Sequence, residues 1–388
     1  MVPNEYLPSH LCEIPNHWKR VRFLDVMKVR QGLQIAISER LKEPTATSKE
    51  YITIQSINKA DQAREYVDTP SHRVICNKDD VLMTRTGNTG IVVTGVDGVF
   101  HNNFFLMDFD RGLIDSKFLV NYLRTNRVQH LILTKAGAST IPDLNHKDFY
   151  SIEFPLAPLP EQRKIAQILS TWDKAIATTE KLIDASKQQK KALMQQLLTG
   201  KKRLVDPETG KAFEGEWEEV KLGEILKIGS GKDYKHLEQG NVPVYGTGGY
   251  MLSVSDYLYD GDSVCIGRKG TIDKPMLLSG KFWTVDTLFF THSFNQTTPQ
   301  FIYQYFLTIN WKKYNEASGV PSLSKSIIEK ISIKIPILEE QQKIASLLTA
   351  ADKEIELLNA KLAHFKQEKK ALMQQLLTGK RRVQVEAD

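Results

Sequence analysis

KKALMQQLLTGK occurs twice in this chain, at Lys190–Lys201 and again at Lys369–Lys380, with all twelve residues identical. The match extends backwards, because LPEQRKIAQILSTWDKAI from Leu159 aligns with LEEQQKIASLLTAADKEI from Leu338 at the same offset of 179 residues. An internal repeat of this length sets the architecture of a fold. The chain is therefore a tandem duplication in which a variable region and a helical segment each occur twice.

The variable regions repeat more faintly than the helical segments. WKRVRFLDVMKVRQG at Trp18 resembles WEEVKLGEILKIGSG at Trp217, and IPDLN at Ile141 resembles VPSLS at Val320. Near identity in the helical segments beside divergence in the variable regions indicates that the two kinds of segment do different work.

Both helical segments carry a stripe of residues that step alternately by three and four positions, which is the seam of a coiled coil. The predicted seam consists of Ile165, Leu169, Trp172, Ile176, Ile183, Leu193, Leu197, Ile344, Leu348, Ile355, Leu358, Leu362, Phe365, Leu372 and Leu376. Pro160 suits a first helical turn, and Gly200 and Gly379 stand where each helix is expected to stop. Helices of about 39 residues are roughly 58 Å long. We expect them to pack antiparallel, the alternative being that each covers only its own domain.

Composition describes a globular chain of 388 residues with 41% hydrophobic and 25% charged residues, long enough for two domains. Three cysteines, Cys12, Cys76 and Cys265, have no CxxC spacing and exclude a disulfide scaffold or a cysteine zinc site. The first residues lack the apolar stretch of a signal peptide, and no run is long enough to span a membrane. We therefore expect a soluble, cytoplasmic protein.

The net charge of +6 is concentrated on the helical segments. Residues 161–203 hold 10 basic and 4 acidic side chains, and residues 340–382 hold 9 and 5. GKKR at Gly200 and GKRR at Gly379 are the densest basic clusters. Such clusters predict sequence-independent contact with phosphates. A solvated helix face with a basic C-terminus explains most of these lysines equally well.

Short strands between Gly, Asn and Asp breakers dominate the variable regions. The predicted strands are YITIQSI at Tyr51, DVLMTRTG at Asp80, IVVTG at Ile91, NFFLMDF at Asn103, SVCIGRKG at Ser263 and TLFFTHS at Thr287. Each region also has one predicted helix, at 117–127 and 299–314. The fold class is therefore α+β, with two mixed, mainly β domains alternating with two long helices.

Polar, donor-rich loops connect these strands. Arg pairs with guanine through two hydrogen bonds, and Asn or Gln pairs with adenine in the same way. The predicted DNA-contact residues are Arg85, Thr86, Asn88, Thr89, Asn102 and Asn103 in the first domain and Lys232, Tyr245, Thr247, Tyr250, Arg268 and Lys269 in the second. Turn formation is the alternative for the Gly-Asn-Thr strings. We interpret AGASTIPDL and ASGVPSL as hinges between domain and helix.

Motifs for chemistry are absent from the sequence. No GK dipeptide is followed by Ser or Thr, so there is no P-loop, and no GxGxxG follows a strand. The Asn/Asp-Pro-Pro-aromatic tetrapeptide of DNA amino-methyltransferases is missing as well. We predict neither a catalytic residue nor a metal site in this chain.

PLPEQRKIAQIL from Pro158, its second copy at Pro336, DVLMTRTGNTG at Asp80, the Trp-anchored entry strands and IPDLN resemble the specificity subunit of type I restriction-modification systems over essentially the whole chain. The resemblance implies a non-catalytic DNA reader whose two domains each recognise one half of a split, asymmetric site, while the coiled helices set the spacer. One departure is Glu339 in place of Pro160, which we expect to alter how the second helix starts.

The resemblance also implies the partners: double-stranded DNA, two methylation subunits and motor-nuclease subunits, with no membrane. S-adenosylmethionine, ATP and Mg²⁺ are expected only on those partner subunits. The predicted domains are 1–158 and 204–337 for DNA recognition, with helices at 159–203 and 338–388. Outward-facing Gln195, Gln196, Gln374 and Gln375 are expected to face the methylation subunits. The alternatives are a coiled-coil protein-protein scaffold without DNA readout and a stand-alone site-specific nuclease.

Overall fold

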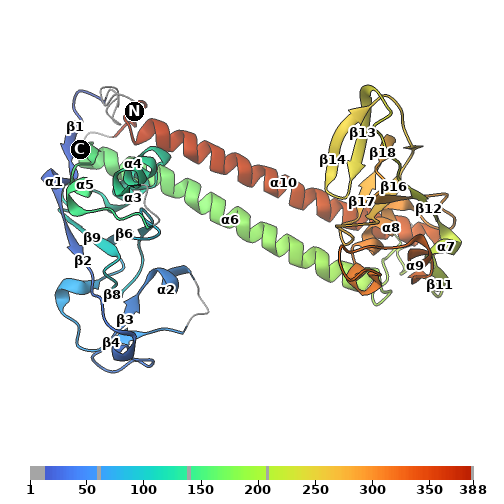
Figure 1. Cartoon of the computed structure of the whole chain (residues 1–388), viewed down its shortest axis with the longest axis horizontal. Helices are drawn as coiled ribbons and strands as arrows, with labels where there is room; N and C mark the ends of the chain where they lie inside the picture. The colour runs from blue at the N-terminus through green and yellow to red at the C-terminus, as the bar shows by residue number, and fades with distance from the viewer. Residues whose placement is uncertain (1–13, 59–62, 138–140, 207–208, 386–388) are drawn as a thin grey trace. The chain divides into compact units, whose positions relative to one another are not determined.

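The structure is a computed structural model that describes residues 14–58, 63–137, 141–206 and 209–385. The chain divides into two units, one of residues 1–178 with 362–388 and the other of residues 179–361. Each unit therefore contains one variable region, the first part of the long helix that follows it and the last part of the other long helix (Figure 1). The predicted domain boundaries follow the sequence repeat, whereas the units divide both helices.

Three small sheets form the variable region of the first unit. β1 (Lys19–Arg22) pairs antiparallel with β10 (Glu153–Leu156). An antiparallel sheet has the order β2 (Met27–Gln31), β9 (Phe104–Phe109), β6 (Val81–Thr84), β7 (Val92–Val93). A mixed sheet has the order β4 (Tyr66–Val67), β3 (Lys49–Ile52), β8 (Gly98–Phe100), β5 (Ile75–Cys76), with β3 and β8 parallel.

Short helices connect these strands. They are α1 (Phe23–Val26), α2 (Ile54–Asn58), α3 (Ser116–Leu123), α4 (Asn126–Ala136) and α5 (His146–Tyr150), with 3-10 turns η1 (Ile37–Glu39) and η2 (His72–Val74). Side chains cap the three helices that precede the long one, because Asp115, Thr125 and Asn145 each accept a backbone N–H of the first turn. These caps fix where each helix begins.

The second unit repeats this strand order in full. Its sheets are β11 (Glu218–Lys221) with β20 (Ser332–Ile335); β12 (Lys227–Ser230), β19 (Leu288–His292), β16 (Ser263–Gly267), β17 (Met276–Leu278); and β14 (Gly249–Val254), β13 (Gln239–Gly246), β18 (Lys281–Thr284), β15 (Tyr259–Asp260). Its short helices are α7 (Leu222–Ile225), α8 (Pro299–Phe306), the 3-10 turn η3 (Trp311–Tyr314) and α9 (Lys325–Glu329). The duplication therefore extends through regions whose sequences have diverged.

Five of the six predicted strands match the structure, and one is wrong over most of its length. Of the residues predicted as strand from Tyr51, only the first two belong to β3, which ends at Ile52, and α2 follows directly. Thr53 and Ser56 cause the change, because the backbone N–H of each donates to the hydroxyl of the other at 2.9 and 3.1 Å. This reciprocal cap turns an apolar run into a helix.

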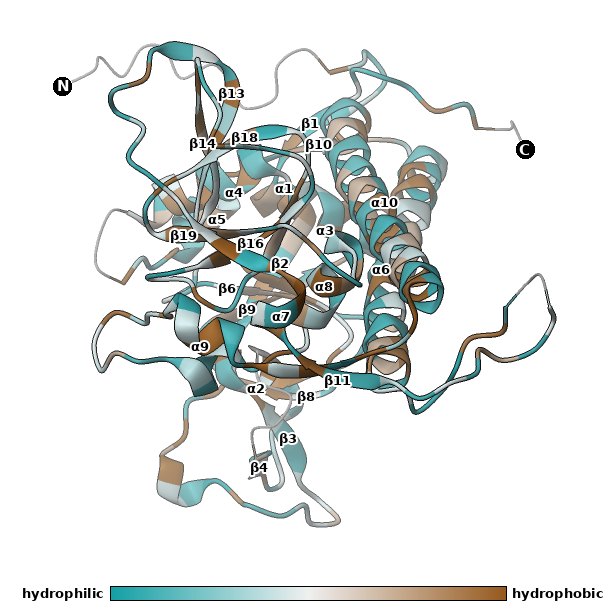
Figure 2. Ribbon diagram, turned by 90° about the vertical axis from the view of Figure 1, so that its right-hand side faces the viewer, coloured by the Kyte–Doolittle hydropathy of each residue, from teal (hydrophilic) through white to brown (hydrophobic). Residues whose placement is uncertain are grey.

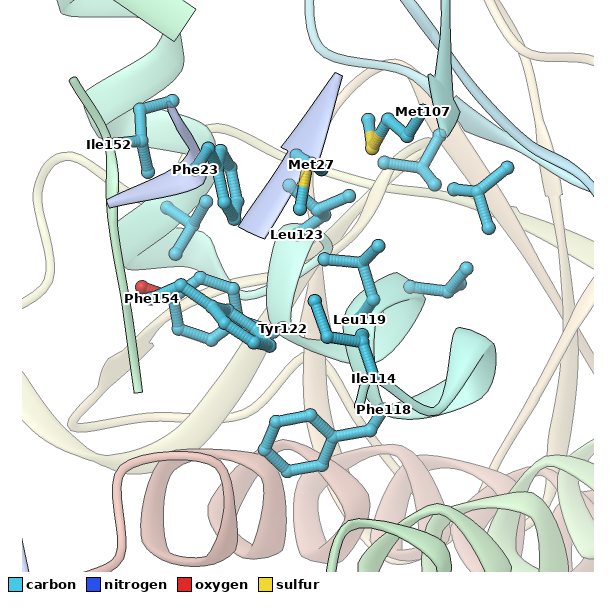
Figure 3. Close-up of a cluster of buried hydrophobic side chains, with 14 of the residues drawn as sticks. Phe23, Met27, Met107, Ile114, Phe118, Leu119, Tyr122, Leu123, Ile152 and Phe154 are labelled. Atoms are coloured by element: carbon cyan, nitrogen blue, oxygen red, sulfur yellow. The ribbon is translucent and has the colours of Figure 1, made fainter. Parts of the chain in front are cut away.

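A large aromatic and aliphatic cluster forms the core of the first unit. Phe23, Phe118 and Phe154 are fully buried in it, and Figure 3 shows Phe118 at the edge nearest α10. Leu376 of α10 belongs to the same cluster. The domain is thus packed on the end of the helix that follows the other variable region. Apolar segments, brown in Figure 2, alternate with hydrophilic teal along the long helices.

The long helices α6 (Leu159–Leu197) and α10 (Leu338–Leu376) are each 39 residues long, as predicted. They start at equivalent residues of the repeat, so the expectation that Glu339 would alter the helix start is wrong. Any residue is tolerated in a first turn, because its N–H has no intrahelical acceptor. Proline is therefore permitted at that position and not required.

The helices run antiparallel within each unit. In the first unit, Trp172 of α6 contacts Phe365 of α10 with ring centroids 5.6 Å apart, and Lys369 forms an ion pair with Asp173. In the second unit, the pair of Lys190 with Asp352 occupies the equivalent position of the repeat. The predicted seam residues are all buried or half-buried. Apolar contact along the seam and one repeated ion pair hold each helix pair together.

Each helix ends at a glycine that turns the chain back. Gly200 and Gly379 have φ of +70° and +74°, a conformation that glycine adopts without strain. The turn brings Arg203 to within 2.8 and 2.7 Å of the carboxylate of Glu340. Arg382 makes the equivalent two-pronged contact with Glu161, with one N–O distance of 2.9 Å. The arginine that ends each basic cluster is thus an internal ion-pair partner, which the phosphate-contact and solvated-face interpretations both missed.

The glutamate of each pair is buried, with Glu161 2% and Glu340 0% exposed. The adjacent glutamines are buried as well and bind the domain core. Gln162 accepts the N–H of Asp115 and donates to two carbonyls, and Gln341 accepts the hydroxyl of Thr297 and also donates to two. The Glu-Gln dipeptide at the start of each long helix therefore attaches that helix both to its own domain and to the end of the other helix.

The Glu161–Arg382 and Glu340–Arg203 ion pairs differ in their further contacts. Arg203 also donates to the Gly215 and Glu214 carbonyls, and His17 lies beside Glu161 and Arg382. Trp18 Nε1 donates to the Glu161 carboxylate at 3.0 Å. Within the described residues, the equivalent indole N–H of Trp217 is buried without a hydrogen-bond partner. Among the same residues the Glu340 carboxylate has Arg203 as its only side-chain partner, whereas Glu161 retains an indole donor if its arginine is removed. The Glu340–Arg203 and Glu161–Arg382 ion pairs should therefore differ in how much stability is lost when the arginine is removed.

We predict that Arg203→Ala destabilises the protein more than Arg382→Ala. Removing Arg203 leaves the buried carboxylate of Glu340 without a partner, a change that costs about 3 kcal/mol or more. Arg382→Ala should cost roughly 1 kcal/mol less, because the Trp18 indole still donates to Glu161. The free energies of unfolding are to be measured by chemical denaturation followed by circular dichroism.

Lys202→Ala is the matched control, because it removes a neighbouring, exposed positive charge and should change stability by less than about 0.5 kcal/mol. Equal losses for both arginine variants would show that the indole contact does not matter. A loss no larger than that of Lys202→Ala would show that the ion pairs contribute nothing.

Candidate DNA interface

The residues predicted to contact DNA in the first domain lie in two neighbouring turns. Arg85 to Thr89 follow β6 in the loop to β7, and Asn102 and Asn103 form the turn between β8 and β9. The Arg85 N–H donates to the Asn103 carbonyl at 2.7 Å and joins the two turns. Side chains from two separate loops are thereby brought to one surface.

A pocket of about 570 Å³ opens beside these turns. Thr86, Asn88 and Asn103 line it, together with Arg40 and His101. Asn88 is exposed, so its amide is available to an incoming base edge. The pocket therefore gathers three residues of the predicted set and adds a cation and an imidazole.

Other predicted residues use their side chains inside the protein. Thr89 is 7% exposed, and its hydroxyl donates to the Pro142 carbonyl at 2.7 Å. The Asn102 amide donates to Gln34 Oε1 at 2.7 Å. These contacts hold the two turns in place. Direct base contact by Thr89 and Asn102 stays a prediction.

The Arg85 side chain is held by an ion pair and by an aromatic ring. Its Nη2 lies 2.8 Å from both carboxylate oxygens of Asp143, and its guanidinium lies 5.4 Å from the centroid of the Phe105 ring. Thr86 also donates its hydroxyl to Asp143. The Arg85 side chain is 16% exposed and that of Asp143 is 46% exposed. Such a half-exposed pair contributes about 0–1 kcal/mol to stability.

In the second domain, the predicted residues surround the segment 284–287 that connects β18 to β19. This segment accepts hydrogen bonds from the N–H groups of Lys232 and Arg268 at 2.9 and 2.7 Å, and a longer one of 3.3 Å from Lys269. It donates one at 3.0 Å to the Tyr245 carbonyl. Three loops that are far apart in sequence thus meet at one connection.

The β13–β14 hairpin carries the remaining predicted residues of the second domain. The rings of Tyr245 and Tyr250 are 6.3 Å apart and nearly perpendicular, and Tyr250 is 63% exposed. Thr247 lies against the backbone of Gly267, because a Cβ at Gly267 would be 3.2 Å from its methyl carbon. The hairpin tip therefore borders the Arg268 loop.

The two predicted interfaces occupy equivalent places in the two domains. Arg85 N–H donates to Asn103 and Arg268 N–H donates to Thr287, in both cases at 2.7 Å and in both cases in the turn before the central strand. The same side of each fold thus presents the loop that follows β6 or β16. Backbone groups make these contacts, so they survive changes of side chain.

A second set of backbone contacts braces the same loops. Leu144 N–H donates to the Arg85 carbonyl at 2.8 Å, and Leu323 N–H donates to the Arg268 carbonyl at 2.9 Å. The two leucines end the AGASTIPDL and ASGVPSL segments. These segments were interpreted as hinges between domain and helix, and the structure shows that they also hold the predicted recognition loop. Residues 138–140 of the first segment lie outside the described residues.

The basic side chains of the second interface are exposed. Lys232, Arg268 and Lys269 have no ion-pair or hydrogen-bond partner for their side chains within the described ranges. The first interface instead holds its loop arginine in an ion pair. The two equivalent surfaces therefore differ in the charge that they offer to a ligand.

Within the described residues, neither a metal-ligand cluster nor a membrane-spanning helix is present. No group of three or more His, Cys, Asp or Glu side chains among them could hold a metal ion. None of the helices there is long and apolar enough to cross a membrane.

Comparison with known proteins gives the family. The sequence profile described as "Type I restriction modification DNA specificity domain" matches residues 15–187 and 214–367. The chain belongs to this family. The type I restriction enzyme MjaVIII specificity subunit of Methanocaldococcus jannaschii is 26% identical over 416 residues, covering 96% of this chain and 95% of that protein. The putative MjaX specificity subunit of the same organism is 26% identical over 417 residues, covering 97% and 96%.

Solved structures share the fold of this specificity-domain chain. The S subunit of a type I restriction-modification system from M. genitalium has a TM-score of 0.63 at 18% identity and covers 96% of this chain and 99% of that one. A chain from a study of complex assembly and conformational transition in the type I system has a TM-score of 0.56 at 17% identity, covering 94% and 99%. At these identities the likeness establishes the architecture alone.

Sequence reasoning missed several residues at the interfaces of this specificity-domain chain. Arg40 and Glu65 form an ion pair at 2.8 Å beside the first pocket, and segment 284–287 organises the second interface. No local sequence pattern marks Arg40, because this residue reaches the first pocket only through tertiary contacts. For segment 284–287 the sequence does give a signal, because the predicted strand from Thr287 begins at the last residue of this segment.

We predict a pH dependence that comes from His101. Its Nδ1 accepts the N–H of Asn103 at 3.0 Å, so the bond requires the neutral ring. Burial, and next the charge of Arg40, lower the pKa of His101 below its usual 6.5. The unfolded chain then binds the proton more readily, so this group's contribution to stability is present above about pH 6.5 and is lost as pH falls through the folded pKa. The thermal midpoint should fall accordingly on acidification.

His101→Gln is the comparison variant, because glutamine remains polar and does not titrate. Its thermal midpoint should fall less than that of the unmodified protein between about pH 7 and pH 5. Parallel curves for the two proteins would show that His101 does not couple the turn to pH.

Proposed function

We propose that this chain is the non-catalytic DNA-reading subunit of a type I restriction-modification complex, with each domain reading one half of a split, asymmetric site. The observation that carries the proposal is the pair of equivalent loop clusters. Both are built on the same strand order and the same backbone hydrogen bonds, yet they present different side chains. Equivalent scaffolds with different polar surfaces suit two readers that recognise different base sequences.

We propose that polar side chains on these surfaces carry base recognition. In the first domain these are Asn88, which is exposed, and Thr86 and Asn103, which are half-buried at the pocket. In the second domain they are the exposed Lys232, Tyr250, Arg268 and Lys269, together with Tyr245 and Thr247 on the hairpin. A tyrosine beside exposed lysines and arginine provides a flat surface and a positive field for a phosphate backbone.

The proposed partners are two methylation subunits and the motor-nuclease subunits. Gln195, Gln196, Gln374 and Gln375 are all exposed, as an interface to a partner requires. Because they repeat between the two helices, the same partner surface occurs twice in the chain. Adenine methylation with S-adenosylmethionine and cleavage with ATP and Mg²⁺ are assigned to those partners, in the cytoplasm where chromosomal DNA is available.

Methylation mapping tests the proposal. The chain is co-purified with an adenine-methylating type I partner, and genomic DNA exposed to the complex is sequenced for methylated adenines. We expect methylation in one split, asymmetric motif. Purified chain without partners should bind duplex DNA with an affinity that falls steeply with salt and should not cut it.

Other outcomes identify the alternatives. A stable complex that leaves the genome unmethylated and does not bind duplex DNA points to a protein-protein scaffold. Metal-dependent cleavage by the purified chain alone would establish a nuclease instead. Each outcome contradicts the proposed reader role.

We predict that lengthening the helices changes the spacer between the half-sites. Ser186 Oγ lies 3.5 Å from Glu354 Oε1, so seven residues are inserted after Ser186 and seven beside Glu354 to keep the seam in phase. Seven helical residues add about 10 Å, or about three base pairs. Methylation mapping should show both half-sites unchanged and a longer spacer. A change in the bases of either half-site would contradict the proposed division of labour.

A further inference from the structure

The two equivalent loop arginines have different surroundings. Arg85 is 16% exposed, pairs with both oxygens of Asp143 and covers the ring of Phe105. Its guanidinium is neutralised by the carboxylate and held against the domain. A guanine presents O6 and N7 as acceptors to an arginine, and the Asp143 oxygens compete for the same donors.

Arg268 lacks both of these contacts. The residue at the position of Asp143 is Ser322, as shown by the matching bridges Thr86 with Asp143 and Lys269 with Ser322. Phe289 occupies the position of Phe105, and its ring is covered by Lys325 at 6.0 Å in place of the loop arginine. Arg268 is exposed and has no side-chain partner in the part of the chain that the structure describes.

The backbone around Arg85 closely matches the backbone around Arg268, so the surroundings of the two side chains can be compared directly. Equivalent backbone hydrogen bonds of the two loops differ in length by no more than 0.3 Å. For example, Gly87 N–H donates to the Pro142 carbonyl at 3.2 Å, and Gly270 N–H donates to the Pro321 carbonyl at 2.9 Å. Gly87 and Gly270 also share positive φ values of +80° and +86°. The arginines therefore leave the same backbone frame, and the side chains around them differ at the position of Asp143 and Ser322 and at the aromatic ring.

We infer that the residue at the brace position, Asp143 or Ser322, determines whether the loop arginine reads DNA. Asp143 withholds Arg85 from the bases of the first half-site, and Ser322 leaves Arg268 free to recognise a guanine in the second. For Arg85 this inference replaces direct base contact by a bracing role. It rests on the proposed function, because it concerns the bases that each domain selects.

Exchanging the brace residues tests the inference in the complex with the methylation subunits. Asp143→Ser should release Arg85 and create a new preference for G·C at one position of the first half-site, on the order of 10-fold in methylation rate over the other base pairs. Ser322→Asp should weaken a G·C preference in the second half-site by a similar factor. The half-site read by the unchanged domain serves as the internal reference for folding and assembly.

Three further variants assign the effect to the arginines. Asp143→Ser with Arg85→Ala should lose the new preference, and Arg268→Ala should reproduce the loss caused by Ser322→Asp. Asp97→Ser is the matched control for charge, because Asp97 is 42% exposed, pairs with Lys49 and lies in the same domain. It should leave both half-sites unchanged.

The outcomes separate this inference from the proposed function. If the unmodified complex methylates a split motif and neither exchange alters base preference, the inference is wrong and the reader role stands. If the unmodified complex methylates no split motif, the proposed function fails first. If Asp143→Ser prevents assembly, Ser322→Asp and Arg268→Ala decide the question, because an unchanged second half-site in both would overturn the inference.

Discussion

The buried glutamate at the start of each long helix, paired with the arginine that follows the end of the other, is the contact on which the rest of the structure depends. Glu340 is 0% exposed and has Arg203 within 2.8 Å, and Glu161 has Arg382. A carboxylate is tolerated in such a place only when it is paired and hydrogen-bonded. Hydrogen bonding to Glu340 also raises the pKa of Arg203. Each domain core is thereby closed by the end of the long helix that follows the other variable region.

This constraint explains why the ends of the long helices repeat closely while the domains diverge. Glu161, Lys190 and Arg203 have the repeat partners Glu340, Lys369 and Arg382, which make the equivalent ion pairs in the other unit. The recognition loops are held differently, by backbone N–H and carbonyl groups that are common to all residues, as in Arg85 to Asn103 and Arg268 to Thr287. Side chains on these loops are therefore free to differ. Under the proposed function, specificity can change without a change of fold, because different atoms determine the two properties.

Much of this could be predicted from the sequence, because the signals are local or repeated. Seam spacing and terminal glycines gave both long helices, and apolar runs between breakers gave most strands. The failures have two different causes. The strand predicted from Tyr51 ends early because Thr53 and Ser56 form a local helix cap that outweighs the apolar pattern. The basic clusters conceal an arginine whose partner is distant in sequence. Neither the brace role of Asp143 nor the contribution of Arg40 to the first pocket has a local pattern.

The sequence by itself determined the duplication, the two long helices, the family resemblance and the loops that carry polar donors. It could do so because repeats, heptads and turn residues act between near neighbours or recur at a fixed offset. Only the tertiary structure decided which donors are exposed and which are already engaged. Arg85 and Arg268 look alike in sequence, yet one faces a carboxylate and the other does not. That difference depends on a residue more than fifty positions away, brought beside the loop by folding.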